Sequence, residues 1–360
     1  MNRTLKFLAA CIGLLSSHRF VRNDHLGLIA VISTLLIASS SISNYGYFSI
    51  AKVVYGQSNP NQVNSNTTSS VNIQDIPVKK VHVGDIDVAY KVFGKGDPIL
   101  LINGASDGME TAWDPSLLKS LSLNHTVIVF DPRGIGNTTM GSKPYTMPVV
   151  ANDTAGLMDA LKIPKAAVMG YSLGSTIAQQ VTIMYPNKVF LVASHCGGKE
   201  GVPAPPEFRK FQSQAVNQSL NHIPVSHAQM QALTVASLGP GWIRLHPESA
   251  KVPENMTFQQ MKPGLPPAVM NSQFNIGHAW EATNWSGACG ELGKLDKPTL
   301  VIVGTNDSLY VPHVNSLIIA EKIPGAWLVQ IKNAGHAIVN QYPAELGKIM
   351  NTFLSATGNG

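Results

Sequence analysis

The sequence predicts an α/β fold, in which helices cover both faces of a mostly parallel β-sheet. From Ile76 onward, short apolar runs alternate with segments of helical periodicity. The runs are apolar at every position rather than at alternate positions, as expected of strands buried on both faces. Residues 166–186 also follow the order strand, tight turn and helix. Together these patterns predict a parallel sheet between two layers of helices.

The first 56 residues are predicted to form a membrane anchor or a signal segment. An uncharged stretch runs from Leu26 to Ala51, and its most apolar part is slightly shorter than the roughly 20 residues of a spanning helix. Arg19 and Arg22 precede this stretch and only Lys52 follows it, so the positive-inside rule predicts an extracellular body. A cleaved signal peptide and a buried helix of a soluble fold are the alternatives. The body is therefore expected to be anchored to a membrane or secreted after cleavage.

Residues 57–75 are predicted to be a flexible polar linker. Asn, Ser and Thr dominate this segment, which has too few apolar side chains to build a core. Asn-x-Ser/Thr sequences recur along the chain, and their number fits a secreted body. They occur at Asn66, Asn124, Asn137, Asn152, Asn217, Asn255 and Asn284.

Charge and cysteine content exclude two classes of function. The formal net charge is +5, but residues 1–57 contain five basic residues and one acidic residue, so the remainder is close to neutral. A nucleic-acid partner is not expected, since the body has no basic stripe or known RNA-binding motif. The three cysteines show no C-x-x-C spacing, so no metal is expected. Cys196 and Cys289 could pair in an extracellular body or stay as two buried thiols.

Residues 76–357 are predicted to form the folded domain. It should open with an antiparallel hairpin, Val78–Val83 and Ile86–Phe93, joined at Gly84. The strands expected next are Ile99–Ile102, Thr126–Phe130, Ala166–Met169, Val189–Ala193, Thr299–Val303 and Trp327–Ile331. The helices expected between and after them are Pro115–Leu121, Val149–Leu161, Ser175–Tyr185, Val314–Ile323 and Ala344–Leu354.

Residues 197–295 interrupt this alternation and are predicted to form an inserted helical lid. Proline-rich turns separate several helix-like runs in this segment. Its aromatic residues could line an apolar substrate pocket, or they could simply pack the lid's own core. These residues are Trp242, Phe274, Trp280 and Trp285.

The turn at Gly170-Tyr171-Ser172-Leu173-Gly174 matches the G-x-S-x-G nucleophile elbow. The pattern alone is weak, but here a strand precedes it and a helix follows it, as the elbow requires. Side chains at Gly170 and Gly174 would collide with neighbouring backbone in so sharp a turn. Ser172 is therefore predicted to be a nucleophile held above the start of the helix.

A serine nucleophile needs a base and a carboxylate that orients the base. Asp307 follows the strand Thr299–Val303, and His336 follows the strand Trp327–Ile331, in the chain order of an elbow enzyme. Both loops should open at the same edge of the sheet as Ser172. Asp307 as a helix cap or turn residue and His336 as a polar loop residue are the alternatives. Activity is expected to fall at acidic pH, where His336 is protonated.

Two backbone amides are expected to stabilise the oxyanion of the tetrahedral intermediate. One is the N–H of Leu173, directly after the nucleophile. The other is the N–H of Ala105, in the loop after the strand Ile99–Ile102, where Gly104 permits close approach. The alternative for this second loop is a plain glycine turn.

Five blocks of this sequence resemble the α/β-hydrolase superfamily, and in particular its esterase and enol-lactonase branch. They are LLINGAS (100–106), FDPRGIGNT (130–138), GYSLGS (170–175), GTNDSLYVP (304–312) and NAGH (333–336), within a resemblance that covers about residues 78–354. The resemblance implies the α/β-hydrolase fold and the triad Ser172, Asp307 and His336. Asn103 stands where the family usually has His, and Arg133 resembles a structural loop residue of the family.

The predicted function is that of a serine hydrolase that cleaves a carboxylic ester or lactone of a small, mainly apolar molecule through an acyl-enzyme on Ser172. No cofactor is expected. The alternatives are an amidase or a cofactor-free perhydrolase of the same fold, and a non-catalytic membrane-tethered ligand-binding protein. Dehalogenases and epoxide hydrolases need a carboxylate at the elbow, so Ser172 excludes their mechanism. The substrate and the oligomeric state stay open.

Overall fold

The computed structural model describes residues 71–193, 206–221, 223–256, 266–281, 288–307 and 313–357. The predicted anchor or signal segment, the linker up to residue 70, Cys196 and Trp285 lie outside the described residues, as do the side chains of Cys289 and Trp280. Among the described helices, none has the length and apolar character needed to cross a membrane.

Eight strands of the described residues form one sheet in the order β1-β2-β4-β3-β5-β6-β7-β8. β1 and β2 form the predicted hairpin, β2 is antiparallel to β4, and the other neighbouring pairs are parallel. The mostly parallel sheet is thus confirmed. The strands are β1 (Lys79–Val83), β2 (Ile86–Gly94), β3 (Asp97–Ile102), β4 (His125–Phe130), β5 (Ala166–Gly170), β6 (Val189–Ala193), β7 (Thr299–Gly304) and β8 (Trp327–Ile331).

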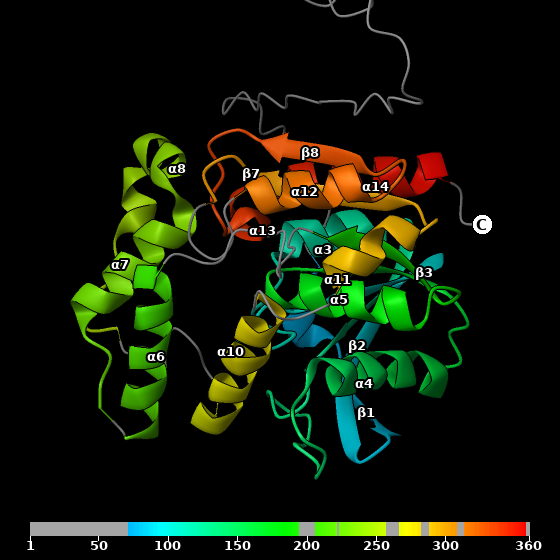
Figure 1. Ribbon diagram of the computed structural model, residues 1–360, viewed down its shortest axis with the longest axis horizontal. Coiled ribbons are helices and arrows are strands. Elements are labelled where there is room, and N and C mark those ends of the chain that lie inside the picture. Colours follow the sequence, from blue (N-terminus) through cyan, green and yellow to red (C-terminus); the bar gives the residue numbers. More distant parts are fainter. Residues whose placement is uncertain are drawn as a thin grey trace, which may run out of the picture. The chain divides into compact units, whose positions relative to one another are not determined.

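Helices cover both faces of this sheet (Figure 1). Residues of α4, α5 and α12 pack into one apolar cluster, and residues of α3 and α14 pack into a second cluster on the opposite face. β3 shows both faces directly, because Leu100 and Ile102 join the first cluster while Ile99 and Leu101 join the second. These helices are α3 (Pro115–Ser122), α4 (Met147–Ala160), α5 (Leu173–Met184), α12 (Val314–Lys322), α13 (Ile338–Gln341) and α14 (Pro343–Thr357).

Local sequence explains where the helices begin. Asp114 caps α3 by accepting a hydrogen bond from the N–H of Ser116, and Pro115 occupies the first turn, where no N–H is needed. Thr146 caps α4 in the same way, so this helix begins two residues before the predicted Val149. α3 thus begins at the predicted residue, whereas the cap places the start of α4 before the predicted one.

The order of the strands also determines where in the fold the site lies. β3 lies between β4 and β5, so the chain passes from one side of β3 to the other after β4. In open α/β sheets, ligands bind at the carboxyl ends of the strands at such a switch point. The loops that follow β3 and β5, with Gly104 and Ser172, meet at that position.

The boundary of the folded domain lies earlier than predicted. Residues 71–75 were assigned to the linker, but Ile73–Asp75 form a short 3-10 helix, η2, capped by Asn72. Ile73 is buried, and its carbonyl accepts a hydrogen bond of 2.8 Å from the buried ammonium of Lys91. The assignment of these five residues to the linker was wrong. The side chain of Ile73 packs into the core, and its carbonyl is the hydrogen-bond partner of a buried ammonium.

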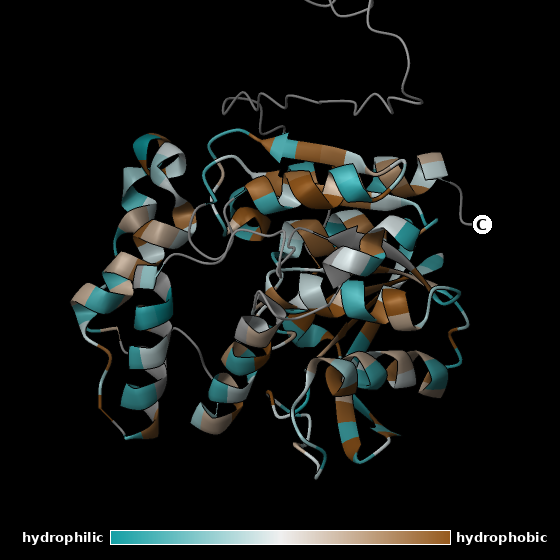
Figure 2. Cartoon of the chain, in the orientation of Figure 1, coloured by the Kyte–Doolittle hydropathy of each residue, from teal (hydrophilic) through white to brown (hydrophobic). Residues whose placement is uncertain are grey.

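The described residues between β6 and β7 form an inserted, mainly helical segment, as predicted (Figure 1). Figure 2 shows that α6 is mainly hydrophilic, in contrast to the apolar strands. Whether the segment acts as a lid stays a prediction. It contains α6 (Pro206–Leu220), α7 (His227–Leu238), α8 (Pro240–Leu245), η3 (Pro247–Ala250), α10 (Pro267–Glu281), α11 (Ala288–Glu291) and η4 (Leu292–Lys294).

Two of the aromatic residues that could line a substrate pocket have defined packing partners. Phe274 packs against the cluster of Ile135, Val269 and Met270. Trp242 stacks on His246, and its indole N–H donates to Ser249. Both also contact residues outside the inserted segment, Phe274 at Ile135 and Trp242 at Tyr342, so neither packs the core of that segment alone.

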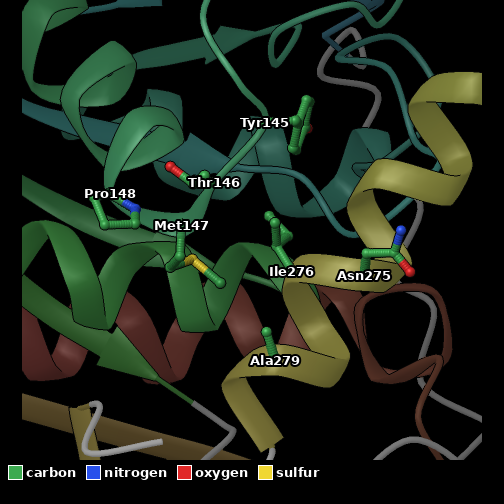
Figure 3. Close-up of a pocket in the computed structure, with 7 residues that line it drawn as sticks. All are labelled: Tyr145, Thr146, Met147, Pro148, Asn275, Ile276 and Ala279. Carbon is green, nitrogen blue, oxygen red and sulfur yellow. The ribbon is translucent and has the colours of Figure 1, made fainter.

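A pocket of about 350 Å³ lies between the start of α4 and α10 (Figure 3). Its lining is Tyr145, Thr146, Met147, Pro148, Asn275, Ile276 and Ala279.

Candidate active site

Ser172 stands in a strained turn between β5 and α5. Its φ of 54° and ψ of −124° are sparsely populated by residues other than glycine. A Cβ at Gly170 would lie 2.1 Å from the carbonyl oxygen of Gly174, and a Cβ at Gly174 would lie 2.1 Å from that of Ile102. Both glycines are therefore required by close backbone approach, as the elbow motif predicted.

Three side chains from distant parts of the chain form one hydrogen-bonded row. Nε2 of His336 lies 2.9 Å from Oγ of Ser172, and Nδ1 of His336 lies 2.9 Å from Oδ2 of Asp307. Asp307 follows β7 and His336 follows β8. The structure thus brings together all three predicted residues, with the geometry in which a carboxylate orients a histidine and the histidine activates a serine.

The loops that carry Asp307 and His336 are fastened to each other. The N–H of Asn306 donates to the carbonyl of Ala334 over 2.8 Å, and the N–H of Asn333 donates to Oγ1 of Thr305 over 3.1 Å. These bonds lie next to the two functional residues in sequence. They fix the separation of carboxylate and imidazole through the backbone.

Aromatic side chains pack beside the imidazole. The ring of Tyr171 lies 5.5 Å from that of His336, centre to centre, and the ring of Trp113 meets Tyr171 edge-on. His336 is only 9% exposed. The base is therefore held on one side by packing and at both ring nitrogens by hydrogen-bond partners.

The loop after β3 approaches the nucleophile closely. A Cβ added to Gly104 would lie 3.3 Å from Cβ of Ser172, so this position has little room for a side chain. Ala105 follows directly in the chain, and Leu173 is the first residue of α5. The first amides of a helix have no intrahelical acceptor, so the Leu173 N–H is of the kind that stabilises an oxyanion. Leu173 thus follows Ser172 in the chain, and Ala105 follows Gly104, which lies beside Ser172 in space.

Buried polar contacts support this loop from within. Asn103 is buried, donates from Nδ2 to the carbonyls of Phe130 and Asp107, and accepts at Oδ1 from the indole N–H of Trp113. The three bonds are 3.1, 3.3 and 2.7 Å long. Asn103, which stands where the family usually has histidine, therefore holds the loop in place through both the nitrogen and the oxygen of its side chain.

Arg133 is buried and structural, as its loop motif indicated. Its guanidinium makes two hydrogen bonds each to Asp153 and Asp85, all between 2.8 and 3.1 Å. Burial alone would lower the pKa of Arg133, but the bonds to these carboxylates outweigh it and raise the pKa. The bonds from Arg133, followed by that from the N–H of Lys143, lower the pKa of Asp85 below its ordinary value.

The inserted segment is hydrogen-bonded to the loop of His336 and to the short helix that follows it. The N–H of Ala337 donates to the carbonyl of Ser237 over 3.0 Å. Gln341 is buried, donates to the carbonyl of Leu238 over 2.8 Å and accepts from the N–H of Gly335 over 2.9 Å. Sequence reasoning did not identify Gln341, since its partner Leu238 lies 103 residues away and no local motif marks it.

Among the residues that the structure describes, no group of three or more His, Cys, Asp or Glu side chains could hold a metal ion.

Known proteins are similar to this chain in fold and in sequence. A family model described as the alpha/beta hydrolase fold matches residues 97–340. A poly(3-hydroxyalkanoate) depolymerase from Ectopseudomonas oleovorans is 28% identical over 259 residues, which cover 71% of this chain and 84% of that protein.

Two solved esterase structures show the same fold. The esterase RhEst1 from Rhodococcus sp. ECU1013 superposes with a TM-score of 0.64 at 20% identity, covering 78% of this chain and 99% of that one. A thermophilic esterase from Thermogutta terrifontis superposes with a TM-score of 0.60 at 24% identity, covering 78% and 99%.

Proposed function

This chain belongs to the α/β-hydrolase fold family, and on that basis we propose that it is a serine hydrolase that cleaves a carboxylic ester or lactone of a small, mainly apolar molecule. The observation that carries the proposal is the unbroken hydrogen-bonded row from Ser172 through His336 to Asp307. A serine hydroxyl is a weak nucleophile unless a base takes its proton, and this row supplies that base.

In the proposed reaction, Oγ of Ser172 attacks the carbonyl carbon while Nε2 of His336 takes the hydroxyl proton. The amides of Leu173 and Ala105 stabilise the oxyanion that forms. His336 then gives its proton to the leaving alkoxide, which departs as an alcohol and leaves an acyl-enzyme. A water molecule, deprotonated by His336, releases the acid, and Asp307 holds the imidazole in the required tautomer throughout.

The preference for an ester bond has support from the relatives. The depolymerase acts on poly(3-hydroxyalkanoate), whose links are carboxylic esters, and both solved structures described above are esterases. The pocket between α4 and α10 (Figure 3) is lined mainly by apolar side chains, but Ser172, His336 and Asp307 are not among its lining residues, so the apolar character of the substrate rests on the sequence. Amide cleavage, perhydrolysis and ligand binding without turnover are the competing functions, and the assay below separates ester cleavage from the first and the third.

The test combines active-site labelling with a substrate panel. We expect a fluorophosphonate probe to label the wild-type protein and Ser355→Ala, an exposed serine in α14, but not Ser172→Ala. We expect wild type to hydrolyse p-nitrophenyl esters or lactones, with Ser172→Ala reduced by about 10³-fold or more. Wild-type protein that is neither labelled nor active, yet binds these ligands as well as Ser172→Ala does, would instead indicate a binding protein. Turnover of anilides alone would indicate an amidase.

We also propose that the N-terminal segment attaches the body to a membrane or directs its secretion. The support is the uncharged stretch after Arg19 and Arg22. Fractionation of cells that produce the full chain, with the mass of the mature protein, tests this. An intact chain in the soluble cytoplasmic fraction would contradict it.

A further inference from the structure

A buried glutamine of the inserted segment is bonded to the loop that carries Ala105. Gln273 of α10 is 2% exposed, and its Oε1 accepts a hydrogen bond of 2.8 Å from the backbone N–H of Ser106. The two residues are 167 positions apart. α10 therefore reaches the loop after β3 through one specific polar contact.

This contact acts on a strained peptide. Ser106 has a φ of 69°, a left-handed conformation that residues other than glycine rarely adopt. Its amide shares one planar peptide unit with the carbonyl of Ala105, so the bond from Gln273 fixes the orientation of that unit. The N–H of Ala105 lies one residue earlier, between this fixed unit and Asn103, which the hydrogen bonds described above also hold.

The same helix touches the second oxyanion donor. Gly277 lies about one turn after Gln273, and a Cβ there would stand 3.8 Å from Cδ1 of Leu173. Ile276 belongs to the same apolar cluster as Leu173. α10 thus bonds to Ser106, the residue that follows Ala105, and packs against Leu173, the other residue whose amide is assigned to the oxyanion.

We propose that Gln273 is a positioning residue, which holds the Ala105 amide in place for the transition state. This role rests on the serine hydrolase function proposed above. Oxyanion donors act through geometry, and a displacement of about 1 Å can reduce a rate about 100-fold. The inserted segment would then be a part of the catalytic apparatus and not only a cover over it.

The decisive variants are Gln273→Met, which keeps the length of the side chain but removes the acceptor, and Gln273→Glu, which keeps an acceptor oxygen. We expect Gln273→Met to lower kcat about 10- to 100-fold while KM changes less than about threefold, because the lost interaction belongs to the transition state. Gln273→Glu should recover most of that loss. Ser272→Ala, a neighbouring substitution on α10, should match wild type. A boronic acid that forms a tetrahedral adduct with Ser172 should bind Gln273→Met more weakly by the same factor as kcat/KM falls.

Different failures have different meanings. A wild-type protein without turnover or probe labelling would overturn the hydrolase function and this role together. An active wild type with an equally active Gln273→Met would overturn this role alone. Equal losses in Gln273→Met and Gln273→Glu, with boronate affinity unchanged, would show a merely structural glutamine. If Gln273→Met does not fold, Gln273→Asn, whose shorter side chain withdraws the acceptor, replaces it in the same comparison.

Discussion

The indole N–H of Trp113 donates a hydrogen bond of 2.7 Å to Oδ1 of Asn103, and both side chains are buried. Asn103 begins the loop between β3 and α3, and its Nδ2 donates to the carbonyl of Asp107, four residues later in that loop. One amide side chain therefore closes this loop on itself and ties it to α3 through the residue that precedes the helix cap. The bond explains why an asparagine can serve at a position where the family usually has histidine.

We predict that Asn103→Leu is both less stable and less active. The substitution leaves the Trp113 indole and the Phe130 carbonyl buried without partners, which costs about 1–3 kcal/mol for each group. We expect kcat to fall about tenfold, since the Ala105 amide loses its support. Trp113→Phe removes only the indole donor and should lose stability with a smaller loss of kcat. Urea unfolding and ester hydrolysis measure both, and an Asn103→Leu protein as stable as wild type would contradict the prediction.

Strain at Ser172 predicts an order of stability between two inactive variants. The backbone of Ser172 has a φ of 54° and a ψ of −124°, which glycine adopts at little cost and alanine does not. We expect Ser172→Gly to be more stable than Ser172→Ala by about 1 kcal/mol, after the higher entropy of glycine in the unfolded chain is subtracted. Thermal unfolding of the two proteins tests this order. A more stable Ser172→Ala would show that the turn carries no strain.

Two glycines predict opposite responses to the same substitution. A Cβ at Gly174 would lie 2.1 Å from the carbonyl oxygen of Ile102, whereas a Cβ at Gly277 would make an ordinary contact of 3.8 Å. We expect Gly174→Ala to lose at least about 3 kcal/mol of stability and the elbow geometry. Gly277→Ala, within α10, should be neutral or more stable by up to about 1 kcal/mol. Unfolding midpoints compare the pair directly, and equal effects would contradict the assigned contacts.

The pairing of Asp85 with Arg133 predicts a pH-dependent stability. Because folding lowers the pKa of Asp85, its ionised form stabilises the folded protein at pH values above its unfolded pKa of about 3.9, and this contribution is lost as pH falls below that value. We expect Asp85→Asn to be less stable than wild type at neutral pH, with a gap that narrows below about pH 4. Burial raises the pKa of Asp131, which acts in the opposite direction but equally in both proteins. Urea unfolding across this range measures the gap, and a constant gap would exclude the linkage.

The parts of the molecule that repeat a local pattern could be predicted from the sequence. The strands are apolar throughout because both faces are covered, and Ser172, Asp307 and His336 each follow a strand at one edge of the sheet. The order of the three residues in the chain and their positions at strand ends were therefore sufficient to predict that they lie together.

The supports of the site could not be predicted in this way. Gln273 and Gln341 look like ordinary polar residues of helices, and their partners Ser106 and Leu238 lie 167 and 103 residues away. A hydrogen bond between such distant residues depends on how the inserted segment packs against the sheet domain. The hydrophobic periodicity of the sequence carries no information on that packing. The same limit explains the error at Ile73, an apolar residue in a mainly polar stretch, whose side chain packs into the cluster that contains Ala89 of β2.

The bond between Ile73 and Lys91 also decides where the chain can be shortened. A protein that starts at Ile76 would lack the carbonyl that accepts from a buried ammonium and would uncover part of the layer beneath it. Removal of everything before residue 71 keeps this contact and the Asn72 cap intact. A shortened protein should therefore keep residues 71–75, because they supply a partner to a buried charge and cover part of the core.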